Sequence, residues 1–292
     1  MKKVCVLLYH KNARILFKPE WIEKCLGSIR NQTYQNFDVL ELNYGQTGIQ
    51  LYKGSIFEHK MLQNHVEAMN YLIDIAKEYY DFIFNVNIDD YYAPNRIGEQ
   101  LKYLKDYDLV ASDYLVIKQK KEKEIIIGSY ENSKLDIKQN LEENNNIIAH
   151  PSVCWRKSFF NNLRYENEIP EEDMRLWQRA IKQKKRMIII PEKLLFYRIH
   201  DNQITQMTQQ NNADIMAQCL LDFIHIFEPS KNKNKFLRWS DMTRIFKSWW
   251  KHFHPEKKLP TQYDLRRTID HTIGDPIPRR GWFVKIRKDY EW

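Results

Sequence analysis

Residues 82–90 read Phe-Ile-Phe-Asn-Val-Asn-Ile-Asp-Asp, a mostly apolar segment that ends in two adjacent carboxylates. Phe82–Val86 has the length and composition of a buried strand. Asp89 and Asp90 repel each other at the end of that strand, so folding alone does not favour the pair, whereas a hard cation would offset the repulsion. An alternative is that one Asp caps a helix that begins near Pro94. The segment therefore predicts a buried strand that leads into either a metal site or a helix cap.

The residues before this segment alternate between strand and helix patterns. Val4–Tyr9 is a continuous apolar run and Phe37–Leu42 is a second strand-like run. Apolar residues recur at helical spacing after Pro19, and again in Val66–Ile75. Strand, helix, strand, helix, strand is the order of a doubly wound α/β sheet.

The residues after this segment predict a more mixed arrangement. The expected elements are a hairpin from Leu109–Ile117 and Glu124–Tyr130, a helix at Glu171–Lys184, a strand at Met187–Ile190 that Pro191 ends, a further strand at Leu194–Ile199, and a helix at Ile215–Phe227.

The carboxyl ends of the first three predicted strands are the expected binding region, because open α/β sheets bind ligands there. In this sequence those ends are His10–Asn12, Asn43–Gly45 and Asn87–Asp90.

Charge divides the chain unevenly. The formal net charge is +8, and residues 231–292 contain 16 Lys and Arg against 7 Asp and Glu. This excess predicts a catalytic domain at 1–229, a linker at 230–235 and a small, basic, mainly helical module at 236–292. The module is rich in aromatic residues, including Trp239, Trp249, Trp250, Trp282 and Trp292.

Neither a membrane span nor a secretory signal is expected. The apolar runs are of strand length, and no small-residue cleavage site follows Met1. The four cysteines are widely spaced and predict reduced thiols rather than a disulfide scaffold. We therefore expect a cytoplasmic protein, and the composition and tail suggest a large DNA virus, which would place it in the host cytoplasm.

Two further groups of side chains have both structural and chemical interpretations. Glu171, Glu172 and Asp173 open a predicted helix, where carboxylates interact favourably with the helix dipole. Three in succession exceed what capping requires, so one of them is a candidate general base. His150 and His200 each follow an apolar segment, where histidine is either structural or a ligand.

The order of these motifs is more specific than any one of them. The series is Asn31-Gln32-Thr33-Tyr34, then Asn87-Ile88-Asp89-Asp90 with Pro94, then His150-Pro151-Ser152-Val153, then Glu172-Asp173-Met174-Arg175-Leu176-Trp177, then Tyr197-Arg198-Ile199-His200. Over residues 3–205 this series resembles the family 2 glycosyltransferases. That resemblance implies a GT-A fold, a Rossmann-like mixed sheet flanked by helices.

The resemblance also implies roles for individual residues. Asp173 matches the base that removes the proton from an acceptor hydroxyl. Asp89, Asp90 and His200 match a site for Mn²⁺ or Mg²⁺ that grips the donor diphosphate.

The remaining site residues surround the two substrates. His10, Asn43 and Asn87 are expected beside the nucleotide, and His150, Glu172 and Trp177 on the acceptor side. Asn87 stands where the family usually has Asp, which predicts weaker metal binding. Asn43 likewise replaces the usual Asp near the base, so UDP is the first expectation, with dTDP or GDP open.

The expected reaction is transfer of a sugar from a UDP-sugar, with inversion, to a glycan, a protein or a lipid-linked acceptor. Two alternatives remain open: a degenerate enzyme that only binds nucleotide-sugars or glycans, and a nucleic-acid-binding protein that acts through its tail. The tail either forms a small core or binds an anionic partner, which would be a membrane surface or a nucleic acid.

Overall fold

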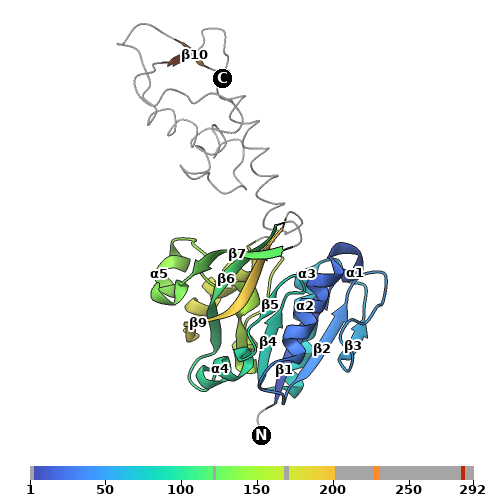
Figure 1. The fold of residues 1–292 in the computed structure, drawn as a ribbon. Helices are drawn as coiled ribbons and strands as arrows, with labels where there is room; N and C mark the ends of the chain where they lie inside the picture. The colour runs from blue at the N-terminus through green and yellow to red at the C-terminus, as the bar shows by residue number, and fades with distance from the viewer. Residues whose placement is uncertain (1–2, 121–122, 168–170, 201–226, 230–283, 287–292) are drawn as a thin grey trace. The chain divides into compact units, whose positions relative to one another are not determined.

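The computed structural model describes residues 3–120, 123–167, 171–200, 227–229 and 284–286 (Figure 1). The chain divides into two compact units, residues 1–200 and 201–292. The first elements of the N-terminal unit are β1 (Val4–His10), α1 (Ala13–Leu16), α2 (Pro19–Arg30), β2 (Asp38–Asn43), β3 (Ile56–His59), α3 (His65–Tyr79), β4 (Phe82–Val86), β5 (Tyr91–Tyr92) and α4 (Arg96–Tyr103). They are followed by β6 (Leu109–Lys120), β7 (Lys123–Tyr130), η1 (Asn132–Lys134), α5 (Ile137–Glu142), η2 (His150–Ser152), β8 (Cys154–Arg156), η3 (Lys157–Phe160), α6 (Glu172–Lys182) and β9 (Met187–Ile199).

One mixed sheet organises this unit. Its strand order is β3-β2-β1-β4-β8-β6-β9-β5, and β7 pairs with β6. β1 runs parallel to β2 and β4, whereas β8 is antiparallel to β4 and β6. The predicted α/β mixed sheet is therefore confirmed, with the first half parallel and the second half mixed.

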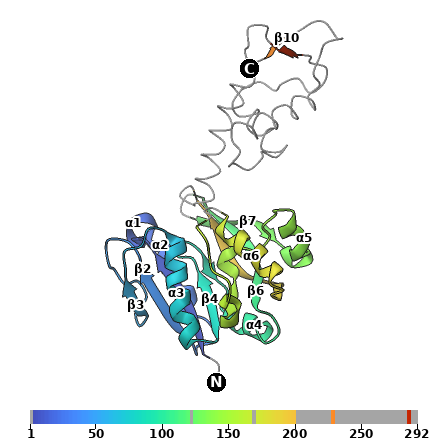
Figure 2. The same cartoon turned by 180° about the vertical axis from the view of Figure 1, so that it is seen from behind.

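Helices cover both faces of the sheet, and each face has its own apolar core. Figure 1 shows α2 and α4 on one side, and Figure 2 shows α3 and α6 on the other. β1 contributes to both cores because successive side chains of a strand point to opposite faces. Val4, Val6 and Leu8 pack with α2, while Cys5 and Leu7 pack with α3.

Three local expectations from the sequence were wrong. β3 was not anticipated, because it is a short edge strand of four residues that are all at least partly exposed. Pro191 does not end a strand, since β9 continues through it. The register with β6 shifts there, from Ser112↔Ile190 to Asp113↔Lys193, so the missing N–H of Pro191 falls in a bulge. Finally, Asn95 is the N-cap of α4, so neither Asp89 nor Asp90 is a helix cap.

In the C-terminal unit, β10 (Phe227–Pro229) pairs antiparallel with β11 (Val284–Ile286). β11 falls in the run Gly281-Trp282-Phe283-Val284-Lys285-Ile286, whose composition favours a closing strand. The predicted helix at 215–227 lies outside the described residues except for Phe227, and so does the predicted linker at 230–235. The predicted basic module at 236–292 lies outside them except for 284–286. These remain predictions. Within the described part of the chain, no helix has the length and hydropathy needed to cross a bilayer.

A buried polar network from α4 joins β4 to the segment that precedes β8. The Arg96 guanidinium donates to the carbonyls of Asn85 (2.9 Å) and Val153 (3.2 Å) and to Gln100 (3.0 Å). Gln100 in turn donates to the carbonyl of Ser152 at 2.7 Å. The network therefore fixes the positions of the two segments that carry the candidate site residues.

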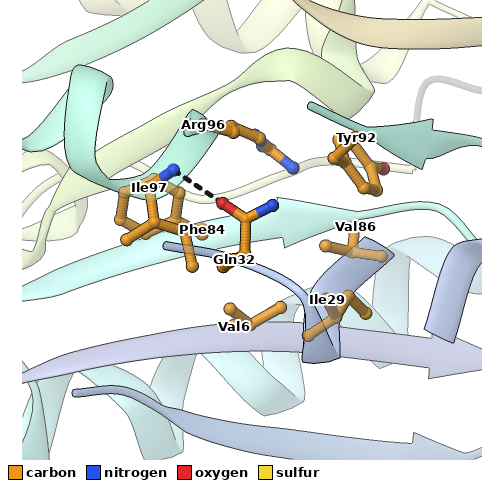
Figure 3. Close-up of a pocket in the computed structure, with 8 residues that line it drawn as sticks. All are labelled: Val6, Ile29, Gln32, Phe84, Val86, Tyr92, Arg96 and Ile97. Atoms are coloured by element: carbon orange, nitrogen blue, oxygen red, sulfur yellow. Dashed lines mark hydrogen bonds between the residues drawn. The ribbon is translucent and has the colours of Figure 1, made fainter. Parts of the chain in front are cut away.

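The side chain of Gln32 also joins separate segments through hydrogen bonds, beside a small gap in the core (Figure 3). Its amide oxygen accepts from the N–H of Ile97 (3.0 Å), and its amide nitrogen donates to the carbonyl of Ala93 (2.8 Å). The gap has a volume of about 10 Å³, roughly the space of one water molecule. It is lined by Val6, Ile29, Gln32, Phe84, Val86, Tyr92, Arg96 and Ile97. We interpret it as a packing gap, and Gln32 as the residue that ties α2 to the loop after Asp90.

We expect Arg96→Met to lower the free energy of unfolding by about 3 kcal/mol, because several buried acceptors lose a charged donor. Chemical denaturation would measure this loss. Arg30→Met is the matched control, since Arg30 is exposed and its ion pair with Glu23 lies at the surface. Equal stabilities for the two variants would contradict the structural role of Arg96.

Candidate functional site

The candidate site lies at the carboxyl ends of β1, β2 and β4. His10 and Asn43 end neighbouring parallel strands and are paired in register. β4 ends at Val86, directly before Asn87. The strand order therefore brings together the three segments that the sequence marked as the expected binding region.

Asp89 and His200 are in direct contact. His200 Nε2 lies 3.0 Å from Asp89 Oδ2, although 111 positions separate the two residues in the sequence. β9 ends at Ile199, and this end places His200 beside the loop after β4. Two of the three predicted metal ligands are thus adjacent.

Asp90, the third predicted ligand, points into the protein. It is 1% exposed, and its Oδ1 accepts from the backbone N–H of Arg198 at 2.7 Å. Burial, together with the charge of Asp89, raises the pKa of Asp90 well above its usual range. As the structure stands, Asp90 anchors β9, and Asp89 is the carboxylate beside His200.

Arg198 of β9 also holds the loop that carries Asp89. Its guanidinium donates to the carbonyl of Asp89 (2.8 Å) and to Glu124 of β7 (2.6 Å), and it lies over the ring of Trp21 at 4.8 Å. Trp21 also packs against His200, with ring centroids 5.1 Å apart. The sequence named neither Arg198 nor Glu124 as a site residue, because their pairing depends on the β6–β7 hairpin.

The pair of Asp89 and His200 fits part of a metal site. Among the described residues, no group of three or more His, Cys, Asp or Glu side chains is placed to hold a metal ion. A carboxylate oxygen and an imidazole nitrogen can supply two of the six ligands that Mg²⁺ or Mn²⁺ takes, and a diphosphate and water would have to supply the others. The residues present therefore suit an ion that binds together with its substrate.

His10 is occupied by a buried carboxylate. Its Nε2 lies 3.2 Å from Glu41 Oε1, and its Nδ1 is buried without a hydrogen-bond partner among the described residues. Glu41 also accepts from the N–H of Tyr52 (2.9 Å) and from Ser55 (2.7 Å). Burial alone would raise the pKa of Glu41, but these hydrogen bonds outweigh it and lower the pKa. His10 is thus fixed at the end of β1.

The amide of Asn43 is used within its own loop. Its oxygen accepts from the N–H of Gly45 (3.0 Å), and its nitrogen donates to Thr47 (3.1 Å) and to the carbonyl of Ile49 (3.2 Å). Gly45 packs closely on Asn12, since a Cβ at Gly45 would lie 2.4 Å from the Asn12 side chain. As the structure stands, Asn43 shapes the loop, and its predicted contact with a base stays a prediction.

Asn87, directly after β4, contacts polar side chains of β1 and β4. Its Oδ1 is 3.4 Å from both the hydroxyl of Tyr9 and the amide nitrogen of Asn85. The pKa of Tyr9 is raised mainly by burial, and also by the charges of Glu172 and Asp89 among other neighbours. Tyr9 is therefore close to both predicted sides.

Asp173 has the environment that a general base needs. Burial, followed by the charge of Glu172, raises the pKa of Asp173 to about 7, although hydrogen bonds from Met174 N and Asn146 oppose the shift. Asn146 donates to Oδ2 at 3.0 Å. A carboxylate with this pKa can take a proton near neutral pH.

Glu172, the neighbour of Asp173, is paired with a residue that the sequence did not mark. His65, at the start of α3, lies 2.7 Å from Glu172 through Nε2 and Oε1. Burial would raise the pKa of Glu172, but this contact outweighs it and lowers the pKa. Glu172 thus keeps its negative charge beside Asp173.

His150 is a half-buried, neutral side chain. Its Nδ1 lies 3.3 Å from the amide nitrogen of Asn85, which makes Nδ1 the acceptor and leaves Nε2 to donate to Tyr165 at 2.8 Å. Burial lowers the pKa of His150 to about 4. His150 therefore links β4 to Tyr165 behind the acceptor side.

Trp177 was expected to contact the acceptor, but its side chain does not reach the surface. It is 0% exposed and packs against Trp155, Phe159 and Tyr165 in the core under α6. The sequence could not reveal this, because an aromatic residue in the first turns of an amphipathic helix faces either the core or the cleft. Trp177 can support an acceptor site only from behind.

Comparison with known proteins supports the same fold. No family model matches the chain. A protein of Haemophilus influenzae named an uncharacterized glycosyltransferase is 25% identical over 228 residues, and the match covers 64% of this chain and 64% of that protein. The chain thus spans less than two thirds of the length of this relative.

The solved structures that resemble the chain include S. aureus TarS. The crystal structure of TarS 1–349 has a TM-score of 0.51 at 12% identity, covering 93% of this chain and 80% of that one. The complex of TarS 1–349 with UDP-GlcNAc has a TM-score of 0.52 at 12% identity, with the same coverage. The chain therefore has the GT-A-like fold of TarS, as the sequence predicts.

Proposed function

We propose that this protein is an inverting, metal-dependent glycosyltransferase that uses a nucleoside-diphosphate sugar, with a UDP-sugar as the first candidate. The observation that carries the proposal is the contact of Asp89 with His200 at the loop after β4, together with Asp173 as a carboxylate whose pKa is raised to about 7. The charges of Asp89 and Asp173 both contribute to the raised pKa of Tyr197, after its burial. The glycosyltransferase name of the Haemophilus influenzae relative and the UDP-GlcNAc complex of TarS support this assignment.

The proposed roles follow from the positions of the side chains. Asp173 accepts the proton of the acceptor hydroxyl as its oxygen attacks the anomeric carbon, and the nucleoside diphosphate leaves from the opposite face. The metal, held by Asp89 and His200, would neutralise charge on the diphosphate. A single carboxylate base without a covalent nucleophile gives inversion.

The degenerate, binding-only alternative rests on Asn87, which adds no charge where the family usually has Asp. It predicts nucleotide binding without turnover. The nucleic-acid-binding alternative depends on the tail at 236–292, most of which lies outside the described residues, and no observation here favours it.

A thermal-shift screen of UDP, GDP, dTDP and CDP, each with and without Mn²⁺, tests the donor class. We expect the largest rise in melting temperature with UDP and Mn²⁺ together. A nucleotide present at 100 times its dissociation constant stabilises a fold by about 2.7 kcal/mol. No shift with any of the four nucleotides would overturn the proposal.

The pKa of Asp173 predicts the pH dependence of turnover. Asp173 is a base only when ionised, so kcat should rise with pH, bend near pH 7 and level off above it. Below the bend, kcat should fall about tenfold per pH unit. UDP release from UDP-GlcNAc, measured across pH 5–9, would check this. A profile that is flat down to pH 5 would exclude a base with this pKa.

A further inference from the structure

Three tyrosines line up across adjacent strands on one face of the sheet. Tyr197 is on β9, Tyr114 on β6 and Tyr130 on β7, strands that Figure 1 shows beside one another. The rings of Tyr114 and Tyr130 are stacked, with centroids 4.8 Å apart and planes within 6°. The ring of Tyr197 meets Tyr114 edge-on at 5.9 Å. We call these three residues the aromatic row.

The inner end of the aromatic row reaches the candidate site. Tyr197 is half-buried and directly precedes Arg198, whose backbone N–H donates to Asp90 (2.7 Å) and whose guanidinium donates to the carbonyl of Asp89 (2.8 Å). The row therefore begins next to the loop that carries the proposed metal ligand, Asp89.

The outer end of the aromatic row is open to solvent, and hydrogen bonds link the segment after it to the neighbourhood of Asp173. Tyr130 is 49% exposed. Asn132 follows Tyr130 by two residues, and its side chain donates to the carbonyl of Ile147 at 2.7 Å. Asn146, the residue before Ile147, donates to Asp173. The row thus extends to the surface of the protein, and the segment that follows Tyr130 is hydrogen-bonded next to Asn146, the partner of Asp173.

Because Gly128 has no side chain, it leaves the strand surface beside Tyr130 uncovered. A Cβ at this position would meet Val116 at 3.8 Å and the ring of Tyr130 at 3.9 Å, which are ordinary contact distances. An alanine methyl group would therefore fit and would contact the edge of the Tyr130 ring. Glycine leaves this edge and the neighbouring strand surface accessible.

We propose that the aromatic row is the acceptor subsite and that it binds a pyranose ring, so that the acceptor is a glycan. This inference rests on the proposed transferase function and specifies its second substrate. A pyranose has one face of C–H bonds and a rim of hydroxyls, and tyrosine offers a flat apolar ring with a polar tip. An uncharged row of rings suits such a ring better than it suits a phosphate group, which would be recognised by Arg or Lys.

Saturation-transfer NMR on the full chain, with UDP and Mn²⁺ present, tests the subsite directly. The probes are methyl β-D-glucopyranoside, methyl β-D-galactopyranoside, methyl N-acetyl-β-D-glucosaminide and the acyclic polyol ribitol. We expect at least one glycoside to receive saturation chiefly at H1, H3 and H5, the protons of one ring face. Ribitol should receive little.

Substitutions at the surface end assign the signal to the aromatic row. Tyr130→Ala should weaken the glycoside signal and raise the glycoside KM by about 5- to 10-fold, with a much smaller change in kcat. Tyr130→Phe should retain binding. Tyr79→Ala is the control, because Tyr79 is also exposed (61%) but lies at the end of α3.

Several results would overturn this inference. They are the absence of signal from every glycoside, an equal signal from ribitol, and an unchanged signal in Tyr130→Ala. An oligomer that Tyr130→Ala dissociates would show instead that the row joins copies of the chain. A normal nucleotide thermal shift alongside any of these results would mean that the glycan inference alone has failed, whereas loss of that shift would reject the proposed function itself.

Discussion

Replacing Asp173 by Asn is expected to lower kcat by about 10²- to 10⁴-fold, the usual contribution of a general base. The amide has nearly the same shape as the carboxylate and can still accept a hydrogen bond from Asn146, but it cannot take a proton at neutral pH. The loss should therefore appear in kcat, and nucleotide binding should be little changed. UDP release under saturating UDP-GlcNAc measures the first effect, and the thermal shift with UDP and Mn²⁺ measures the second.

The stability of this variant distinguishes lost chemistry from lost fold. The folded-state pKa of Asp173 is raised to about 7, so the native state disfavours its ionisation relative to the unfolded chain. The stabilising contribution of the protonated carboxyl is complete below the unfolded-state pKa of about 3.9 and is lost as pH rises through about 7. At pH 8, Asp173→Asn should consequently melt at the same temperature as the parent or higher.

The control for Asp173 is Glu171→Gln on the same helix end, where Glu171 forms an ion pair with Arg175 at the surface. We expect this variant to change kcat less than threefold. If Asp173→Asn kept more than a tenth of the parent activity, another residue would have to be the base.

Replacing Asp89 by Asn is expected to abolish the Mn²⁺-dependent part of the nucleotide thermal shift and to weaken metal binding by at least about 100-fold. Asp89 is the carboxylate that lies against His200. Even the loss of a residue that only hydrogen-bonds to a metal ligand lowers metal affinity by about 10- to 100-fold. Titration of Mn²⁺ into the UDP-bound protein would measure the change. Asp74→Asn, at a partly exposed position on α3 where Asp74 pairs with Lys77 and Arg164, is the matched control.

Asp90→Asn gives the contrasting result. Asp90 accepts the N–H of Arg198 inside the protein, so its substitution should alter stability more than Mn²⁺ affinity. Equal losses of Mn²⁺ affinity in Asp89→Asn and Asp90→Asn would show that both carboxylates bind the ion. Undiminished Mn²⁺ affinity in Asp89→Asn would remove the proposed metal site.

Local patterns in the sequence determined β1, β2, β4, α2 and α3, which build most of the parallel half of the sheet, but not the short edge strand β3. Phe82–Val86 was predicted with the bounds that β4 has, because a short apolar run bounded by polar residues has few other stable arrangements. The position of the candidate site was predictable for a related reason. The carboxyl ends of parallel strands lie on one edge, so His10, Asn43 and Asn87 had to be near one another.

Only the tertiary structure decided what each side chain does at that edge. Asp89 and Asp90 are equivalent as a pattern, yet one lies beside His200 and the other is buried against Arg198. Asp173 and Glu172 likewise differ, because Glu172 contacts His65, which lies 107 positions away in the sequence. The physical reason is that burial and long-range pairing set the charge state and direction of a side chain. Sequence spacing fixes neither when the partners come from distant strands and helices.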